Sequence, residues 1–257
     1  MQINPESEFT KLTGSLESYL YRLTANRQDA EDLLHDTFII VKQSFASFKG
    51  LSSFKTWVFS IATNLARDNH RVKNRWAVDV QDLCKQAAID NSHYAERMVA
   101  AFQSQPEQRF ELAEHINYCF TCLSKNLSLE KQIAIVLKEM YAFKRSEIAE
   151  IMHITEGVVK HLLFDGRKDL QEKYNHRCAL INKTGACYQC AELNNYFQGD
   201  KSADEKVKAL GLGPENSAED NLDQRFQLIS RINPLTSNGA VTEDVILQIL
   251  RETIQDK

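Results

Sequence analysis

The chain has 257 residues, of which 43% are hydrophobic and 26% are charged, and its formal net charge is −4. This composition excludes a disordered or membrane-spanning chain, and the length allows one to three globular domains. The chain has no run of about 18 apolar residues, and its first residues, MQINPESEFTKL, show no secretory signal, so we expect a cytoplasmic protein with reduced thiols. Acidic residues are concentrated near the C-terminus, where positions 191–257 hold 12 Asp and Glu against 7 Lys and Arg.

Apolar residues recur at helical spacing through most of the chain. Trp57, Ile61 and Leu65, for example, lie four positions apart and share one helical face. Glycine and proline are scarce, and the alternating Val, Ile and Thr runs typical of strands are missing. The sequence therefore predicts an all-α protein. Its expected parts are a first helical domain at 1–76, a polar linker at 77–110, a second helical domain at 111–176 and a small, mainly helical C-terminal extension at 177–257.

An acidic amphipathic helix is predicted near the start of the segment 29–76, DAEDLLHDTFIIVKQSFASFKGLSSFKTWVFSIATNLARDNHRVKNRW. Asp32, His35 and Asp36 lie at near-helical spacing, with Leu33 and Phe38 beside them. Such a face suits a basic partner helix. A solvated acidic face is the ordinary alternative.

Aromatic and basic residues follow in the same segment and suggest contacts with single-stranded nucleic acid. Phe48, Phe54 and Trp57 surround Gly50, and stacking surfaces next to phosphate contacts are what a captured strand requires. We expect Phe54 and Trp57 to be core residues of one helix face, which leaves Phe48 and Asn64 as site candidates. The basic candidates are Lys49, Arg67, Arg71, Lys73 and Arg75.

Two short helices joined by a tight turn are predicted at 145–174, RSEIAEIMHITEGVVKHLLFDGRKDLQEKY. Ser146 and Thr155 suit N-caps, and the small Ala149 suits the point where the helices cross. This is the helix-turn-helix pattern, whose second helix enters the major groove, and a plain helical hairpin is the alternative. The expected apolar face of the second helix is Val158, Val159, Leu162, Leu163 and Leu170. Its candidates for base edges and phosphates are Glu156, Lys160, His161, Phe164 and Arg167.

Together these segments resemble the extracytoplasmic-function (group IV) sigma factors of the bacterial sigma-70 family. The region 2 pattern of that family is D-A-E-D-L-x-Q-x-x-F, F-x-G-x-x-x-F-x-x-W-L and N-x-x-x-D-x-x-R. The chain matches it at Asp29–Leu33, Phe38, Phe48–Gly50, Phe54, Trp57, Asn64, Asp68 and Arg71. The region 4 pattern E-I-A followed by G-T-V is met by Glu147–Ala149 and Gly157–Val159. The two motifs stand in the family order with no region 3 between them, and the resemblance covers residues 8–175.

The resemblance implies a transcription initiation factor, not an enzyme, that binds core RNA polymerase and promoter DNA. In this family the acidic helix binds the β′ clamp and region 4 binds the β flap. The loop Phe48–Phe54 with Asn64 would hold a flipped base of the −10 element, and the second helix of the helix-turn-helix would read the −35 element. A separate anti-sigma factor is a further partner that the sequence leaves open.

The chain departs from the family pattern at several positions. His35 stands where glutamine is common. His161, Leu162 and Asp165 stand where family members often carry arginine, and the Asp165 carboxylate would repel phosphate. The −35 helix is thus less basic than usual, which predicts an unusual promoter preference or a weaker grip.

Two other function classes are open to the sequence. A helix-turn-helix repressor or activator with a metal- or redox-sensing tail would need neither the aromatic block nor the acidic helix. An oxidoreductase would rest on the Cys187-x-x-Cys190 pair, but a thioredoxin-like pair requires a βαβ context that the sequence does not offer.

The C-terminal extension opens with a cysteine-rich stretch, HRCALINKTGACYQC. We expect Cys178, Cys187 and Cys190 to bind a soft ion, first of all zinc, because two thiolates at C-x₂-C spacing can hold one tetrahedral ion. The fourth ligand would be His176 or a distant residue such as one of the pair Cys119–Cys122, which otherwise suits a buried core. Redox switching and inert structure remain the alternatives. The acidic extension could also fold over a basic face of either domain and mask it.

Overall fold

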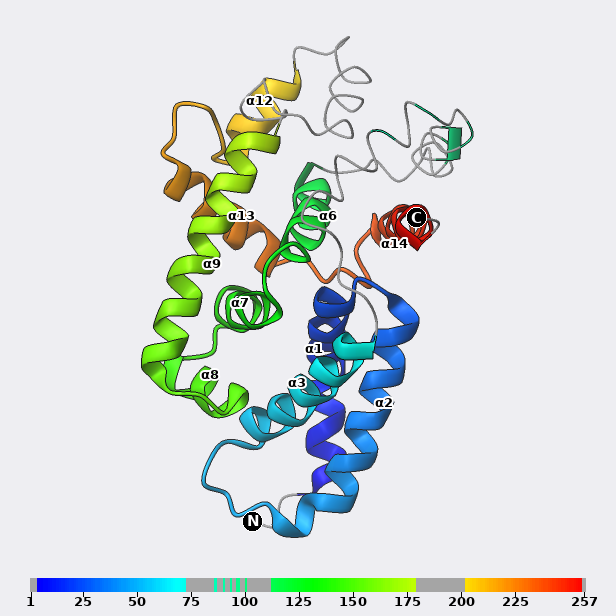
Figure 1. Ribbon diagram of the computed structural model, residues 1–257, viewed down its shortest axis with the longest axis vertical. Coiled ribbons are helices and arrows are strands. Elements are labelled where there is room, and N and C mark those ends of the chain that lie inside the picture. The colour runs from blue at the N-terminus through cyan, green and yellow to red at the C-terminus, as the bar shows by residue number, and fades with distance from the viewer. Residues whose placement is uncertain are drawn as a thin grey trace. The chain divides into compact units, whose positions relative to one another are not determined.

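The computed structural model describes residues 4–72, 112–178 and 202–255, together with the single positions 86, 90, 93, 96, 97 and 100. Every regular element within these residues is a helix, which confirms the all-α prediction for the described part of the chain (Figure 1). None of these helices has the length and apolarity that a membrane span requires. The chain divides into two compact units, unit 1 at Met1–Arg75 and Ser128–Gly166, and unit 2 at Trp76–Leu127 and Arg167–Lys257.

Unit 1 joins the N-terminal helices with the helix-turn-helix. Its elements are α1 (Pro5–Thr24), α2 (Arg27–Ser44), the 3₁₀ turn η1 (Phe45–Ser47), α3 (Phe54–Val72), α7 (Leu129–Ile135), the π-helical η2 (Val136–Met140), α8 (Arg145–Met152) and the first part of α9 (Glu156–Arg177). α1 lies along α2, and α3 packs against both of them (Figure 1). α3 also packs against α8, so the first helical domain and the helix-turn-helix share one unit.

The boundaries of α1 and α2 follow from capping chemistry. The Asn4 side chain accepts hydrogen bonds from two backbone N–H groups of the first turn of α1, and Pro5 has the fixed φ angle that suits a first helical position. α1 ends at Ala25, whose φ of 52° is left-handed and breaks the helix. The next residue, Asn26, caps α2, so two long helices follow each other with a sharp turn between them.

The core of unit 1 is built from aromatic residues of α1, α3 and the η2–α8 connection. Tyr19 and Phe59 are both fully buried, with ring centroids 5.2 Å apart. The Tyr19 hydroxyl satisfies its polar end with Thr63 Oγ1 at 2.7 Å. Phe143 reaches the same cluster, with its ring centroid 4.9 Å from that of Phe59. The helix-turn-helix is therefore packed on the core of the N-terminal helices.

The turn of the helix-turn-helix is formed by residues 153–155. His153 ends α8 in the left-handed region, with a φ of 56°. Thr155 Oγ1 accepts a hydrogen bond from the backbone of α9, as predicted for an N-cap. At the other end of α8 the expectation was wrong, because Lys144 and not Ser146 occupies the cap position. The Glu147 carboxylate accepts a hydrogen bond from the Lys144 N–H at 2.7 Å, which places the cap two residues before the predicted one.

The buried face of α9 is narrower than predicted. Val159 and Leu163 are buried, but Val158 is 45% exposed. Successive residues of a helix lie about 100° apart, so Val158 and Val159 do not face the same core. Gly166 is also buried, and a Cβ atom at this position would lie 3.0 Å from Ile135 Cγ1. Glycine here allows α9 to approach α7 closely.

Unit 2 contains the whole C-terminal extension, 177–257. Its described helices are α6 (Leu112–Ser124), the rest of α9, α12 (Ser202–Ala209), α13 (Ala218–Ser230) and α14 (Ala240–Gln255). α13 packs against α6, where the rings of Phe120 and Phe226 meet edge to face with centroids 6.0 Å apart. The buried Glu114 carboxylate accepts a hydrogen bond from the Gly239 N–H, just before α14, at 2.9 Å. The extension is thus folded onto α6.

Candidate nucleic-acid and polymerase interface

The acidic face of α2 is presented to solvent as the sequence suggested. Asp32, His35 and Asp36 are all exposed. Leu33 is only 6% exposed and is a core residue, while Phe38 is half-buried against α1. The surface that a partner could contact on this helix is therefore polar, and Leu33 supports it from beneath.

An aromatic cluster joins η1 to the start of α3. The closest pair is Phe48 and Trp57, whose ring centroids are 4.9 Å apart, and Phe54 lies 5.9 Å from Phe48. Phe45, which the sequence motifs did not indicate although it stands three residues before Phe48, completes the cluster at 6.1 Å. All four side chains are half-buried, so Phe54 and Trp57 are not the core residues that we expected. The cluster instead combines packing with partly accessible ring surface.

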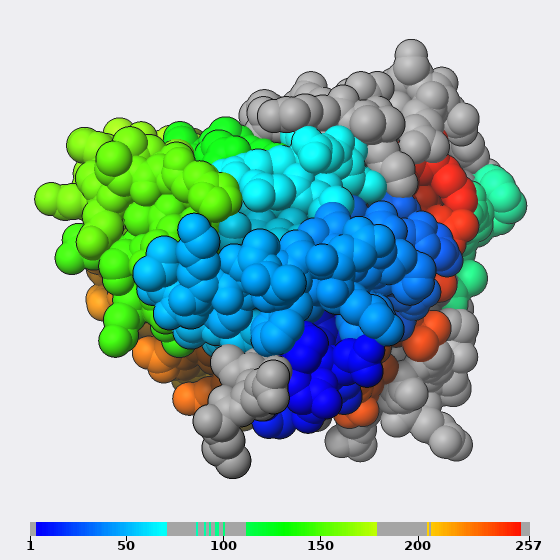
Figure 2. All heavy atoms as spheres, turned by 90° about the horizontal axis from the view of Figure 1, so that it is seen from below, coloured from blue at the N-terminus to red at the C-terminus, as the bar shows by residue number. Residues whose placement is uncertain are grey.

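The chain near position 50, light blue in Figure 2, lies at the surface of the face shown there. Lys49 is exposed, and Leu51 is 89% exposed. Gly50 between them has a φ of 68°, a conformation that other residues rarely adopt. The glycine lets the chain reverse and places a cation beside the aromatic cluster.

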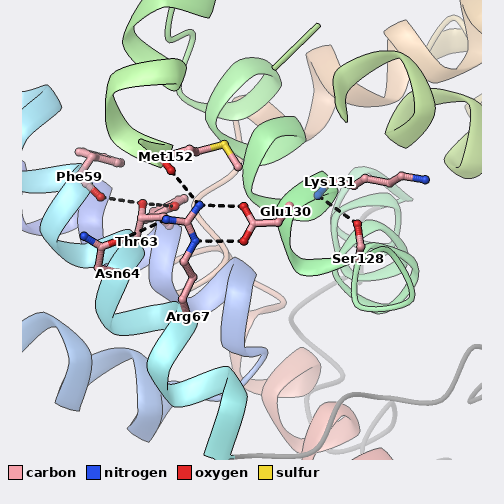
Figure 3. A network of polar contacts seen from close by, with 9 residues as sticks. Phe59, Thr63, Asn64, Arg67, Ser128, Glu130, Lys131 and Met152 are labelled. Atoms are coloured by element: carbon pink, nitrogen blue, oxygen red, sulfur yellow. Dashed lines mark hydrogen bonds and ion pairs between the residues drawn. The ribbon is translucent and has the colours of Figure 1, made fainter. Parts of the chain in front are cut away.

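Arg67 has its guanidinium fully engaged within unit 1 (Figure 3). Nε and Nη2 donate to the two carboxylate oxygens of Glu130 at 3.1 and 2.8 Å. Nη2 also donates to the Met152 carbonyl oxygen at 3.2 Å, and Nη1 donates to Asn64 Oδ1 at 3.2 Å. The Arg67 side chain is 17% exposed, whereas Asn64 is exposed. The paired donors match a carboxylate fork, the strongest geometry for such a contact.

Other side chains support the contact of α3 with the helix-turn-helix. Ser60 Oγ lies 3.0 Å from His153 Nε2, in the turn between α8 and α9. Lys55 Nζ lies 4.4 Å from the centroid of the Phe143 ring, within the range of a cation–π contact. Glu130, on α7, is another residue packed against α3 that the sequence motifs did not indicate, because it stands 63 positions from Arg67 and no periodic pattern links them.

The remaining basic candidates of the first domain are only partly described. Arg71 belongs to the last turn of α3. Lys73 and Arg75 lie outside the described residues. The candidate strand-binding surface is therefore built here from the aromatic cluster, Lys49 and Asn64.

The N-terminal half of α9 exposes the side chains predicted to read DNA. Glu156, Lys160, His161 and Phe164 are all exposed, and Phe164 is 68% exposed. Lys160 and Phe164 are four residues apart, so they share one helical face. Phe164 is therefore a large apolar side chain that is exposed to solvent one turn from the Lys160 cation. This arrangement suits contact with a partner better than packing in the core.

Arg167 continues the same helix but is held by the C-terminal extension. Its Nη2 pairs with the carboxylate of Asp223 on α13, and its side chain is 23% exposed. The guanidinium carbon lies 5.3 Å from the centroid of the Phe226 ring. Two side chains from one turn of α13, a carboxylate and an aromatic ring, therefore contact Arg167, a residue predicted to bind DNA.

Three cysteines gather near Tyr174 on α9. Cys178 is buried directly after α9, and its N–H donates to the Tyr174 carbonyl oxygen at 2.9 Å. Burial is the main reason that the pKa of Tyr174 lies well above its usual value, and Cys119, Cys178 and Cys122 raise this pKa further. Arg225 opposes them, and its guanidinium carbon lies 4.1 Å from the centroid of the Tyr174 ring.

The predicted metal ligands are divided between described and undescribed parts of the chain. Cys187 and Cys190 lie outside the described residues, and His176 is exposed. Within the part that the structure describes, no group of three or more His, Cys, Asp and Glu side chains could hold a metal ion. The prediction of a site that includes Cys187 and Cys190 is not tested by this result.

Two family models match the chain in order along the sequence. Sigma-70 region 2 matches residues 9–76, and Sigma-70, region 4 matches residues 119–170. The ECF RNA polymerase sigma-E factor of Haemophilus influenzae is 28% identical over 163 residues, which are 63% of this chain and 81% of that protein. The ECF RNA polymerase sigma factor SigX of Bacillus subtilis is 25% identical over 157 residues, which are 61% of this chain and 76% of that protein.

A solved structure also shows similarity to this chain. It is the sigma factor RpoE in complex with the anti-sigma factor NepR from Bartonella quintana, with a TM-score of 0.45, 20% identity and coverage of 65% of this chain and 94% of that chain. The family assignment rests on the two region models and the sequence relatives, which agree with the motifs at 29–76 and 145–174. The chain belongs to the extracytoplasmic-function sigma factors of the sigma-70 family.

Proposed function

We propose that this chain is a transcription initiation factor that binds core RNA polymerase and directs it to specific promoters. The observation that carries the proposal is the presence of sigma region 2 and sigma region 4 in family order on one chain. The factor acts by binding and not by catalysis, together with polymerase in the cytoplasm. An anti-sigma factor is a further proposed partner.

Each region is assigned one binding task. The exposed Asp32, His35 and Asp36 of α2 would contact the β′ clamp, and region 4 would contact the β flap. The aromatic cluster around Phe48, with Asn64, would hold an unstacked base of the −10 element, since aromatic faces bind bases of any sequence. The exposed face of α9 would read the −35 element from the major groove.

A helix-turn-helix repressor or activator is not favoured. Such a protein needs the helix-turn-helix alone, whereas this chain also carries the exposed acidic face of α2 and the aromatic cluster beside Lys49. Both features belong to region 2, and region 2 is matched over 68 consecutive positions, residues 9–76.

Transcription from genomic DNA tests the proposed function, because a whole genome contains every promoter that the factor could use. We expect the chain, added to core polymerase from its own organism, to produce transcripts with defined 5′ ends that core alone does not produce. Asp36→Ala removes a proposed clamp contact and should lower their yield about tenfold or more, because truncation of a charged interface contact typically costs that much. The measurement is sequencing of transcript 5′ ends.

Glu219→Ala is the matched control, because Glu219 is also an exposed acidic residue of a helix but lies on α13. It should leave polymerase-dependent transcription at least as strong as that of the unmodified chain. The initiation role would be contradicted if the chain bound duplex DNA but produced no transcripts with defined 5′ ends. That result would favour a helix-turn-helix repressor instead.

We also propose that Cys178, Cys187 and Cys190 hold a soft metal ion, zinc first of all. The proposal is supported by the C-x₂-C spacing of the last two residues and by the reduced state expected of cytoplasmic thiols. The alternatives are a disulfide switch and a purely structural role. Measurement of bound metal distinguishes both from the proposed metal site.

A further inference from the structure

We propose that the C-terminal extension inhibits −35 binding from within the chain, because α13 occupies Arg167 of the DNA-reading helix with the carboxylate of Asp223. The inference rests on the proposed function, since it assigns a regulation to the same DNA-binding helix. It identifies the inhibitory element as a single turn of α13 that begins at Asp223.

Arg167 belongs to the face of α9 that the proposed function uses. Lys160, Phe164 and Arg167 are spaced by four and three residues, so they lie on one side of the helix. Phe164 is 68% exposed, but only 23% of the Arg167 side chain is exposed. The Asp223 carboxylate and the Phe226 ring both contact the guanidinium and contribute to this difference.

α13 is anchored, so Asp223 is presented by a fixed helix and not by a loose chain. Leu222 and Ile229 are completely buried, and Phe226 is 3% exposed. The Phe226 ring meets Phe120 of α6 edge to face, and Arg225 lies over the Tyr174 ring of α9. α13 therefore packs on both α6 and α9 while its acidic side chain holds Arg167.

A second anchor holds the extension to α6. Asn117 Nδ2 donates to Glu243 Oε2 of α14 at 3.2 Å, and both side chains are buried. The Glu114 carboxylate accepts the Gly239 N–H, and a Cβ atom on Gly239 would lie 3.0 Å from Glu114 Oε2. Buried polar contacts of this kind fix a docking geometry because each needs its partner. They hold the end of the extension to α6, the helix on which α13 also packs.

The pairing reduces the positive charge that α9 offers to DNA. A guanidinium that is bound to a carboxylate must leave it before it can bind phosphate, and the carboxylate itself repels phosphate. Phosphate contacts supply nearly all of the affinity for DNA of arbitrary sequence. Release of Arg167 from Asp223 should therefore raise the affinity even for a DNA duplex that contains no promoter.

The experiment compares Asp223→Asn with Glu219→Gln in the full-length chain. Both substitutions remove one negative charge from exposed positions of α13, four residues apart, but only Asp223 pairs with Arg167. The probe is a fluorescent duplex of mixed sequence, and anisotropy is measured over a series of salt concentrations. We expect Asp223→Asn to bind about two- to fivefold more tightly, the range of one partly exposed ion pair. Its salt slope should steepen by about 0.9, the value of one added phosphate contact.

Two outcomes would overturn the inference. Equal affinities of Asp223→Asn and the unmodified chain mean that the pair does not limit DNA binding. An equal gain in Glu219→Gln means that overall charge, and not the hold on Arg167, is responsible. In the double variant Arg167→Gln/Asp223→Asn, the gain should disappear, and persistence of the gain would equally contradict the mechanism.

The same samples separate this inference from the proposed function. Matching thermal unfolding curves establish that each variant is folded. If the unmodified chain supports promoter-dependent transcription while all variants bind DNA alike, only the regulatory inference fails. If no variant supports transcription with core polymerase, the initiation role fails, although the effect of Asp223 on duplex binding can still hold.

Discussion

At the scale of single residues, two arginines that the sequence assigned to DNA meet a carboxylate of their own chain. Arg67 makes a bidentate contact with Glu130, and Arg167 pairs with Asp223. The planar guanidinium fits a carboxylate and a phosphate with the same pair of donors. If these arginines bind DNA as proposed, each internal pair must be exchanged for a phosphate, and we expect the strength of the pair to set how easily this happens.

A buried histidine on α6 makes the stability of unit 2 dependent on pH. Burial lowers the pKa of His115 from 6.5 to about 4. The unfolded chain thus takes up the proton at a higher pH than the folded chain, so stability is complete above pH 6.5 and is lost as the pH falls toward 4. We expect the free energy of unfolding to drop by about 2 kcal/mol between pH 7 and pH 5 from this group alone.

The check is urea unfolding at both pH values for the unmodified chain and for His115→Gln, which cannot titrate. The substitution should lower stability at pH 7, because it disturbs a buried position, but it should remove the histidine part of the pH dependence. An identical loss between pH 7 and pH 5 in both chains would show that His115 is accessible to protons in the folded state.

At the scale of elements, the contact of α3 with α7 and α8 should compete with binding of an opened DNA strand. Glu130→Gln weakens the hold on Arg67 but keeps the shape of the side chain. We expect about two- to fivefold tighter binding of a single-stranded oligonucleotide, because Arg67 becomes available to phosphate. The variant should also lose no more than about 1 kcal/mol of stability, since the pair is partly solvent-exposed and screened.

Glu150→Gln on α8 is the control, since it removes the same charge at an exposed position of the neighbouring helix. Anisotropy with the oligonucleotide and thermal unfolding of both variants give the answer. A stability loss without any gain in strand affinity would mean that Arg67 serves only the packing of α3 against α7 and α8.

Most helices and both motifs could be predicted from the sequence, because their signals are local. The helix-turn-helix is set by the buried Ile148, Ala149 and Met152, by the left-handed His153 and by the Thr155 cap. The misplaced N-cap at Ser146 shows where this approach fails. A serine is a good cap in isolation, but the Glu147 carboxylate bonds to the Lys144 N–H and moves the helix start.

The parts of the site that could not be predicted depend on contacts between distant residues. Glu130 meets Arg67 across 63 positions, and Asp223 meets Arg167 across 56. No periodic pattern in the sequence links residues so far apart. An exposed acidic residue also looks the same in the sequence whether its side chain is solvated or paired. Phe54 and Trp57 were assigned to the core because they share a helix face, but Phe45 and Phe48 lie beside them and leave all four half-buried.

At the scale of the whole molecule, the extension contacts the C-terminal half of α9, the same helix whose N-terminal half is proposed to read DNA. Cys178 is buried directly after this helix, and its N–H donates to Tyr174 one turn earlier. The Tyr174 ring lies under Arg225 of α13, which is two residues from Asp223. Any change at Cys178, such as metal binding or oxidation, therefore acts next to the surface on which α13 is held.

This link leads to a prediction about metal removal. We expect the full chain, purified under reducing conditions, to contain about one zinc ion, as a tetrahedral thiolate site would require. The double substitution Cys187→Ser/Cys190→Ser should remove the metal, whereas Cys84→Ser, in the predicted linker, should retain it. Elemental analysis of the three proteins measures this directly. Retention of zinc by the double variant would place the metal elsewhere.

Chelation should then loosen α13. Loss of the ion removes a constraint at Cys178, one turn after Tyr174, and the support of the Tyr174–Arg225 contact weakens with it. We expect faster hydrogen exchange of the backbone amides in 218–230 after chelation, with unchanged exchange in α1 of unit 1 as the internal reference. The double cysteine variant should show the faster rate without a chelator. If zinc is present but its removal leaves α13 exchange unchanged, the metal stabilises the extension without controlling its hold on Arg167.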